Sequence, residues 1–394
     1  MKPPTGSLVK RVYKLESEMA FDYLKIANEV AKSGMKIISF GVGQPYFDTP
    51  DTIKEVAINA LKAGYTGYVA SAGIPELRLA IAEHVSKFTG ADVKDNEVMV
   101  TPGGKQSIYF SIMSFVKTGD EVIISDPSYP TYESIVKYVG GKPVHIPLRE
   151  EKEFRMTPED VEKAVTGKTR MIVLNSPQNP TGGVNTRRDI DGILEIAKRK
   201  EIVVLSDEIY DHYVYDGEHA SVLADSDWRD NVIYVNGFSK TYSMPGWRLG
   251  YAVARREVID RFEVYADNTH SCVNSFVQRA GVVALTMPQD FFRDILKEYK
   301  MRRDYIYEGL NKTPGVKANK PKGTFYIFPN IKKILDETGL STAEFTKKLI
   351  REKGVVTLPG TPAFSSALGE GYIRLNYGLP IERIDEGLRK LRLN

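Results

Sequence analysis

The chain has 394 residues, of which 42% are hydrophobic, so it can bury a large core and exceeds the size of one small domain. Its 54 basic and 51 acidic residues nearly balance and no basic block stands out, which argues against nucleic acid or an anionic membrane as a partner. The single cysteine cannot form an internal disulfide, and no apolar run has the length of a signal peptide or a membrane span. We therefore expect a cytoplasmic protein whose partners are small molecules.

Seven β-rich runs follow one another through the middle of the chain, and amphipathic helical segments such as Arg187–Lys200 lie between several of them. Strand and helix alternating in this way predict an α/β fold, with a mostly parallel sheet covered by helices. The runs are Glu97–Thr101, Asp120–Ser125, Lys142–Leu148, Arg170–Asn175, Glu201–Ser206, Asn231–Asn236 and Arg248–Ala254. We assign residues 43–287 to this large domain.

The pattern changes at about Pro288, where the long charged helix "DFFRDILKEYKMRRDYIYEGL" precedes strands and helices in mixed order. This change predicts a smaller α+β domain over residues 288–394. A further helix is expected at about Phe21–Lys32. We assign it, with the rest of residues 1–42, to an N-terminal segment that packs with the small domain.

Four of the predicted strands end in residues that are able to hold a ligand. In open α/β sheets, ligands bind beyond the carboxyl ends of the strands. Taken alone, each feature also has an ordinary explanation as a turn, a structural loop, a helix cap or a surface lysine. In chain order, the features are Gly103-Gly104-Lys105 before a helix, the loop Asn175–Gly182, Asp207 with Tyr210 three residues on, and Lys240.

Together these features suit an aromatic aldehyde cofactor that carries a phosphate. A lysine amine bonds to the aldehyde, and a carboxylate keeps the pyridine nitrogen protonated, so that the ring withdraws electrons. A phenol and an amide hydrogen-bond the ring hydroxyl, while a helix N-terminus and an arginine hold the phosphate. The five histidines show no metal-ligand spacing, so no metal site is predicted, and His212 is expected on a helix that follows Asp207.

At these residues the chain resembles the fold type I pyridoxal-phosphate enzymes of the aspartate aminotransferase superfamily, the class I and II aminotransferases. The resemblance runs from Ile38–Pro50 to Gly369–Pro380 in the order typical of the family. Its main motifs are "SPQNPTG", "SDEIY", "GFSKTYSMPGWRLG" and "YIRLNYG". It implies pyridoxal 5'-phosphate as the cofactor and a homodimer with shared active sites.

The resemblance also implies a role for each matching residue. Lys240 would be the Schiff-base lysine, and Asp207 the partner of the pyridinium nitrogen. Tyr210 and Asn179 would contact the ring hydroxyl, and the ring of Tyr129 would stack on the cofactor. The other implied positions are the phosphate ligands Gly103, Gly104, Lys105 and Arg248, the substrate ligands Gly43, Tyr129, Asn179 and Arg374, and Tyr68, which would reach the phosphate of the neighbouring subunit's cofactor.

Two positions depart from the family pattern. Gly237 stands three residues before the lysine, where many relatives have a phosphate-binding serine, so the Ser239 hydroxyl is a candidate replacement. Tyr129 stands where several aspartate-specific relatives have tryptophan, which keeps a stacked ring but removes an indole donor. The second departure argues against strict aspartate specificity.

The activity implied by the resemblance is amino transfer in two stages, with aspartate and 2-oxoglutarate as the expected substrates. The freed lysine moves the α-proton, and for this a fraction of its amine must be neutral. Aromatic amino acids, alanine and a carbon–sulfur β-elimination on the same fold are the alternatives. A regulatory ligand sensor is a further alternative, which the presence of Lys240, Asp207 and Arg374 argues against.

Overall fold

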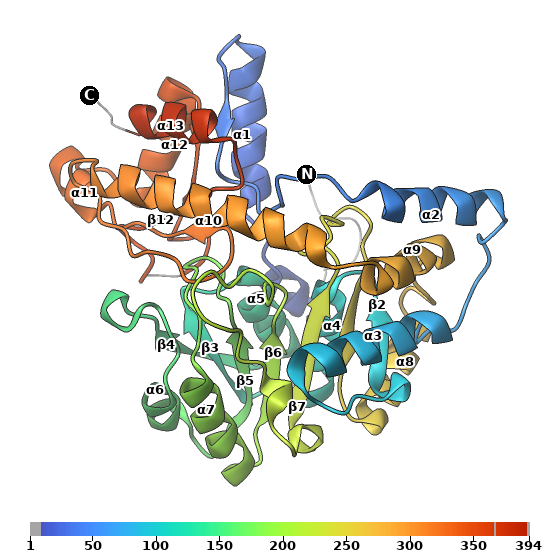
Figure 1. Cartoon of the computed structure of the whole chain (residues 1–394). Coiled ribbons are helices and arrows are strands. Elements are labelled where there is room, and N and C mark those ends of the chain that lie inside the picture. The colour runs from blue at the N-terminus through green and yellow to red at the C-terminus, as the bar shows by residue number, and fades with distance from the viewer. Residues whose placement is uncertain (1–8, 366–367, 392–394) are drawn as a thin grey trace.

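The computed structural model describes residues 9–365 and 368–391, which form a large lobe on a seven-stranded sheet and a smaller lobe above it (Figure 1). The strands of the large sheet lie in the order β2-β8-β7-β6-β5-β3-β4. None of the helices in these two ranges combines the length and apolar character that a membrane span requires. The seven strands are β2 (Val98–Thr101), β3 (Glu121–Asp126), β4 (Lys142–Pro147), β5 (Thr169–Asn175), β6 (Val203–Asp207), β7 (Val232–Gly237) and β8 (Gly250–Val253).

The sheet is mixed but mostly parallel, as the sequence predicts. Strands β3 to β7 pair in parallel, whereas β8 runs antiparallel to both β2 and β7. Each of the seven runs predicted from the sequence overlaps one strand, with ends that differ by no more than two residues. Their continuous apolar character follows from burial on both faces of the sheet.

Helices cover both faces of this sheet and divide its side chains between two cores. Along β5, Ile172 and Leu174 pack into one core, and Met171 and Val173 pack into the other, because successive strand residues point to opposite faces. The helices of this lobe are α2 (Asp51–Lys62), α3 (Pro75–Thr89), α4 (Gly104–Phe115), α5 (Pro130–Val139), α6 (Pro158–Ala164), α7 (Arg187–Arg199), α8 (Arg256–Asp267) and α9 (Ser275–Thr286).

The smaller lobe combines four helices with two short sheets, and its long helix α10 crosses above the large lobe in Figure 1. Its helices are α10 (Asp290–Asn311), α11 (Lys332–Thr338), α12 (Thr342–Lys353) and α13 (Ile381–Lys390). One sheet consists of β11 (Leu358–Pro359), β12 (Ile373–Asn376) and β9 (Tyr326–Ile327), and the other pairs β1 (Ile38–Ser39) with β10 (Val355–Val356).

The N-terminal helix α1 (Ala20–Lys32) packs with the smaller lobe. Its buried residues Tyr23 and Ala27 share a core with Ile350 of α12 and Val356 of β10. Ahead of it, the short 3₁₀ helix η1 (Lys10–Lys14) lies against α5 of the large lobe. The N-terminal region therefore touches both lobes, and the division at residues 43–287 stays a prediction.

One local expectation is wrong. Residues Ile209–His212 form a turn after β6, so Asp207 caps no helix and His212 lies on none. The backbone N–H of Ile209 instead donates to the Asp207 carboxylate at 3.3 Å. The turn allows Tyr210 and Tyr213 to enter the aromatic core of the smaller lobe, and burial of these large rings outweighs local helix propensity.

Candidate active site

Three neighbouring parallel strands end at one edge of the large sheet and bring the predicted amide loop, carboxylate and amine together. Asn175 at the end of β5 pairs in register with Asp207 at the end of β6. The adjacent strand, β7, leads through Gly237 to Lys240. The side-chain amide of Asn175 donates to the backbone oxygen of Asp207 at 3.0 Å, which ties the loop to the strand end. The sheet itself thus fixes the spacing of these groups.

Lys240 lies in the turn after β7 with its amine inside the site. Its Nζ donates to the backbone oxygen of Gly43 at 2.6 Å and lies 5.6 Å from the ring centre of Tyr210. Burial lowers the pKa of Lys240 to about 8, and the positive charge of Arg374 contributes, although Asp207 opposes the shift. Since an exposed lysine titrates near pH 10.4, this amine has a far larger neutral fraction at neutral pH. Lys240 is therefore not an ordinary surface lysine.

Asp207 is a buried carboxylate with two hydrogen-bond donors. Tyr132 donates its hydroxyl to Oδ2 at 2.7 Å, in addition to the N–H of Ile209 at Oδ1. Burial raises the pKa of Asp207 to about 6, against the opposing effects of the Tyr132 hydrogen bond and the charge of Lys240. A carboxylate held in this state is ionised at neutral pH, and a cation placed beside it would be strongly stabilised.

Tyr210 and Gly43 meet a residue of the smaller lobe that the sequence did not single out. The hydroxyls of Tyr210 and Tyr326 lie 2.8 Å apart, and both side chains are buried. Gly43 leaves no room for a side chain, because a Cβ there would come within 2.3 Å of the Tyr326 hydroxyl. The glycine therefore allows the segment after β1 to pass close to Tyr326 and to present its carbonyl to Lys240.

Arg374 projects from β12 of the smaller lobe and is 96% buried, since its exposed fraction is 4%. Its Nη1 donates to Oδ1 of Asn179 at 3.0 Å and its Nη2 to the backbone oxygen of Gly41 at 2.6 Å. Its Nε is buried and meets no hydrogen-bond acceptor within residues 9–365 and 368–391. An unpaired buried donor on a guanidinium is costly, and a bound carboxylate would satisfy it. The structure thus brings Arg374 and Asn179 together, as the resemblance implies.

The start of α4 and Arg248 form a cradle for an anion. Gly103 is the N-cap of α4, with φ of 84°, and a Cβ at this position would come within 2.2 Å of Nη2 of Arg248. The first N–H groups of a helix have no partner inside it and carry partial positive charge, which suits a phosphate. Arg248 donates to the backbone oxygens of Pro245 and Pro102, so its guanidinium is held over the helix start.

The neighbourhood of Gly237 explains its departure from the family pattern. A Cβ at Gly237 would come within 2.8 Å of the Cα of Gly250, which faces it on β8. In turn, a Cβ at Gly250 would come within 2.5 Å of the backbone nitrogen of Gly104. A serine at position 237 therefore does not fit this close approach of backbones. Ser239, the candidate replacement, precedes Lys240 in the chain and is buried.

The side chain of Lys105 is paired with a carboxylate of the chain itself. Its Nζ donates to Oε1 of Glu18 and lies 5.7 Å from the ring centre of Tyr129. Tyr129, the N-cap residue of α5, donates its hydroxyl to the same Glu18 oxygen at 2.7 Å. The side chain of Lys105 thus shares the Glu18 carboxylate with Tyr129, and the backbone of Lys105 belongs to the start of α4. No motif around Glu18 marked this residue in the sequence.

Tyr68 is exposed, whereas Asp207, Tyr210 and Arg374 are buried. It follows α2 in the loop before α3, and 90% of its side-chain surface is exposed. A tyrosine this exposed makes little packing contact within its own chain. Its implied role needs a second subunit, and that role stays a prediction.

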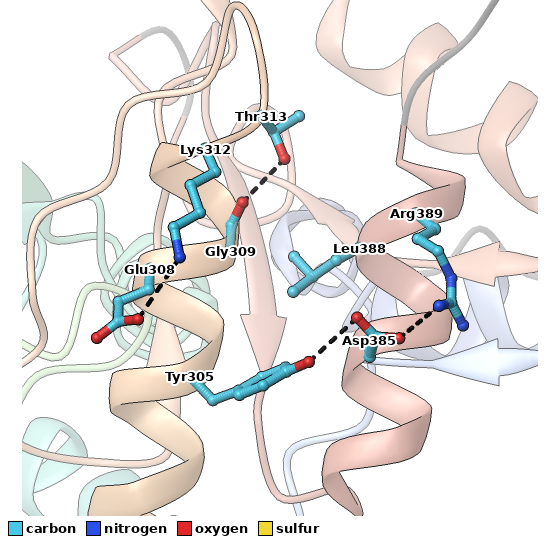
Figure 2. A pocket seen from close by; sticks show the side chains of 8 residues that line it. All are labelled: Tyr305, Glu308, Gly309, Lys312, Thr313, Asp385, Leu388 and Arg389. Atoms are coloured by element: carbon cyan, nitrogen blue, oxygen red, sulfur yellow. Dashed lines mark hydrogen bonds and ion pairs between the residues drawn. The ribbon is translucent and has the colours of Figure 1, made fainter.

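A separate hollow of about 430 Å³ lies in the smaller lobe between α10 and α13 (Figure 2). Its charged side chains are matched to one another, with Lys312 3.8 Å from Glu308 and Arg389 2.7 Å from Asp385. The hydroxyl of Tyr305 also donates to Asp385, at 3.1 Å. Such a self-paired surface offers no free charge and no buried reactive group, so we assign the chemistry to the strand ends.

Comparisons with known proteins agree with this geometry. The sequence profile of the family "Aminotransferase class I and II" matches residues 35–391. Among curated proteins, an aspartate aminotransferase of Sulfolobus acidocaldarius is 45% identical to this chain, over 97% of this chain and 96% of the relative. Aromatic-amino-acid aminotransferase 2 of Thermococcus litoralis is 40% identical over 90% of each chain. Among solved structures, the aspartate aminotransferase of Thermus thermophilus with maleate is 33% identical, with a TM-score of 0.90, over 98% of this chain and 99% of its own. The chain therefore belongs to the class I and II aminotransferases and is a transaminase.

Proposed function

We propose that this transaminase uses pyridoxal 5'-phosphate to move an amino group between an L-amino acid and a 2-oxo acid, with aspartate and 2-oxoglutarate as its preferred pair. The observation that carries the proposal is the buried amine of Lys240, which has a pKa of about 8 and lies in the electrostatic reach of Asp207 and Arg374. Amino transfer requires an amine, an acidic side chain and a group that binds the substrate carboxylate, all around a single space.

The residues present fit this cofactor. The cradle of Gly103 and Arg248 suits its phosphate, because a side chain at position 103 would fill the space beside the guanidinium. Asp207 suits its ring nitrogen, since a buried carboxylate with a raised pKa favours a cation as its neighbour. Lys240 would hold the aldehyde covalently, with Tyr210 and Asn179 toward the ring hydroxyl and Tyr129 against the ring face.

When bound, pyridoxal phosphate supplies an electron-withdrawing ring that makes the α-proton of the amino acid removable. Lys240 would take that proton on Nζ and later release it, for which its neutral form is needed first. Its lowered pKa keeps this form populated near neutral pH. Arg374 and Asn179 orient the substrate by its α-carboxylate, and the unpaired Nε of Arg374 is the donor that this carboxylate would satisfy.

Aspartate is the proposed amino donor because relatives named aspartate aminotransferase are 45% and 43% identical to the chain over nearly its whole length. Aromatic amino acids are the second candidate. They are supported by the pairing of Lys105 with Glu18, because in this structure the ammonium of Lys105 is neutralised by a carboxylate of the chain itself. Alanine and carbon–sulfur β-elimination have no comparable observation in their favour.

The working form is proposed to be a homodimer in which Tyr68 reaches the cofactor phosphate of the other subunit. The exposure of Tyr68 on the loop between α2 and α3 supports this arrangement. In a two-fold dimer the same loop of each chain can complete the site of the other.

A substrate panel tests the proposed function. The purified protein is mixed with single amino acids while the absorbance of bound pyridoxal phosphate is followed, and products are identified with and without 2-oxoglutarate. We expect a 2-oxo acid and the aminated cofactor without an acceptor, and continuous turnover only with one. Ammonia and pyruvate released without an acceptor would identify a β-lyase instead.

A further inference from the structure

The segment Val9–Met19, which we name the N-terminal strap, spans the two lobes and passes the candidate site. At one end it continues into α1 on the smaller lobe. At the other end Arg11 lies 5.6 Å from the ring centre of Tyr138, and the backbone N–H of Glu16 donates to Ser134 at 3.0 Å, both on α5. Glu18 lies between these two attachments.

The carboxylate of Glu18 gathers three donors on one oxygen. Oε1 accepts from Lys105 Nζ, from the Tyr129 hydroxyl at 2.7 Å and from the Thr131 hydroxyl at 3.5 Å. Burial raises the pKa of Glu18, but Lys105 and Tyr129 outweigh burial and lower it overall, so the carboxylate is charged. An ammonium, a phenol and a hydroxyl that converge on one oxygen form a carboxylate-binding site, which here is filled by the chain itself.

This internal carboxylate lies close to the groups that handle the substrate. Arg374, the α-carboxylate clamp, contributes to the lowered pKa of Glu18, and Glu18 in turn acts to raise the pKa of Lys240. The Tyr129 that hydrogen-bonds Glu18 is the same residue whose ring is implied against the cofactor. Because Tyr129 contacts Glu18 directly, we expect the side chain of a substrate held by Arg374 to extend toward Glu18.

We propose that the Glu18 carboxylate occupies the binding position of the second carboxylate of an acidic substrate. Glu18 pairs with Lys105 when the substrate side chain is uncharged, and a dicarboxylic substrate displaces it. This inference rests on the proposed function, with its second candidate donor, an aromatic amino acid, accepted beside aspartate. A transaminase that pairs a neutral amino acid with 2-oxoglutarate must accept both side chains in one site. Two carboxylates cannot share the single ammonium of Lys105 without repulsion, so one of them has to leave.

The strap is built so that Glu18 can leave at small cost. Its apolar residues Val9, Tyr13 and Leu15 are 60%, 68% and 45% exposed, so little buried apolar surface holds it down. Glu18 itself is 24% exposed, and Lys105 is 49% exposed. A rotation of the Glu18 side chain toward solvent would free Lys105 without moving α1 or α5.

The test compares Glu18→Gln with Glu16→Gln. Glu16 lies on the same strap but is 70% exposed and 3.8 Å from Lys137, outside the site, so its variant removes the same charge without touching Lys105. For each protein, kcat/KM is measured for aspartate and for phenylalanine with a common acceptor. The affinity for succinate, a dicarboxylate without an amino group, is measured by calorimetry.

In Glu18→Gln we expect succinate to bind about 10-fold more tightly and the ratio of aspartate to phenylalanine kcat/KM to rise about 10-fold, which is the scale of one charged hydrogen bond at a half-exposed site. Glu18→Ala should move both values further in the same direction, and Glu16→Gln should change neither. Equal changes for aspartate and phenylalanine, or unchanged succinate affinity, would show that Glu18 only fastens the strap and would overturn the proposal.

The two proposals fail in different ways. If the unmodified protein converts no amino acid, the proposed function is wrong, yet succinate binding still reports on Glu18 through its variants. Lys105→Met should abolish the gain in succinate affinity when it is combined with Glu18→Gln. If the unmodified protein transaminates normally and the Glu18 variants leave selectivity unchanged, only the role of Glu18 is wrong.

Discussion

The strand ends of the large lobe and the N-terminal strap hold polar groups of the candidate site in opposite ways. Asp207 and Asn175 sit on neighbouring strands, are buried, and are fixed by hydrogen bonds to Tyr132 and to the strand backbone. Glu18 belongs to the N-terminal strap, which has exposed apolar residues and makes few polar contacts with α5. The first arrangement resists displacement, while the second permits it.

This difference suggests a division of labour. The groups that handle the reacting bond need a fixed geometry, because small displacements of a catalytic group cost rate steeply. The group that faces the variable side chain benefits from a weak hold, since it must adapt to more than one substrate. Substitutions at the strand ends should therefore lower kcat strongly, and substitutions at Arg374, Glu18 or Tyr68 should mainly change the affinity for substrate or cofactor.

The largest effect is expected for Lys240→Ala. Removal of the amine takes away the proton carrier, and general acid–base catalysis alone contributes about 10²–10⁴-fold. Turnover should fall by at least this factor, and the cradle of Gly103 and Arg248 should still bind pyridoxal phosphate non-covalently. Steady-state rates and cofactor content measured on the same sample check both parts. Near-normal turnover would mean that another group moves the proton.

Asp207→Asn should come next, with a loss of about 10²–10³-fold in kcat, the usual cost of losing one preorganised electrostatic partner. The pKa of Asp207 is about 6 without the cofactor, so its protonated fraction grows as the pH falls below 6 and its charge is then lost. The affinity of cofactor-free protein for pyridoxal phosphate should thus decline below pH 6.

Fluorescence titration at several pH values checks this pH dependence. Below pH 6, the affinity of Asp207→Asn for pyridoxal phosphate should fall less than that of the unmodified protein, because the variant has no carboxylate to protonate. Any titration of the cofactor itself lowers the affinity of the variant and of the unmodified protein alike. Asp160→Asn is a matched control, since Asp160 is also buried but pairs with Arg149 and Lys152 away from the site. Equal pH dependence in the unmodified protein and in Asp207→Asn would contradict the assigned role.

Arg374→Lys keeps the positive charge and loses the two-pronged geometry. KM should rise about 10- to 100-fold for every amino acid and every 2-oxo acid together, because all of them share the carboxylate that the fork binds. Arg383→Lys is the control, since Arg383 also donates to a backbone oxygen, that of Ile37, but lies outside the site. A change confined to one substrate would show that Arg374 reads the side chain.

The smallest effect is expected for Tyr68→Phe, which should weaken pyridoxal phosphate binding by about 2- to 10-fold through the loss of one hydrogen bond. A sharper version mixes Lys240→Ala chains with chains carrying Tyr68→Arg. In the mixed dimer, one site carries both lesions and the other carries neither. Activity should return on subunit exchange, and its absence after proven exchange would rule out shared sites.

The sequence predicted the rigid part of the molecule well, because a strand buried on both faces leaves a continuous apolar run and its end is marked by the change to polar residues. Asp207 and Lys240 lie at such ends, and parallel pairing then places them side by side. The helix expected after Asp207 does not form, because burial of the aromatic rings of Tyr210 and Tyr213 overrides the local pattern.

The residues that the sequence did not reveal come from the other lobe or from the strap. Tyr326 reaches Tyr210 across 116 positions of the chain, and Glu18 reaches Tyr129 across 111. No local periodicity encodes contacts of this range, and only the packing of the two lobes creates them. Tyr132 is the exception, since it stands three positions after Tyr129 on a helical segment and so shares its face.

The central claim, that Lys240 is the reactive amine, is tested most directly by covalent trapping. Cofactor-free protein is incubated with one equivalent of pyridoxal phosphate near pH 8, where Lys240 is about half neutral and ordinary lysines with pKa near 10.4 are almost fully protonated. Borohydride then makes the attachment permanent, and peptide mapping locates it, with Lys240→Ala as the control. We predict one label per chain on the peptide that contains "GFSKTY", and no defined site in the control. A label spread over surface lysines, or one that persists at a single other lysine, would contradict the account.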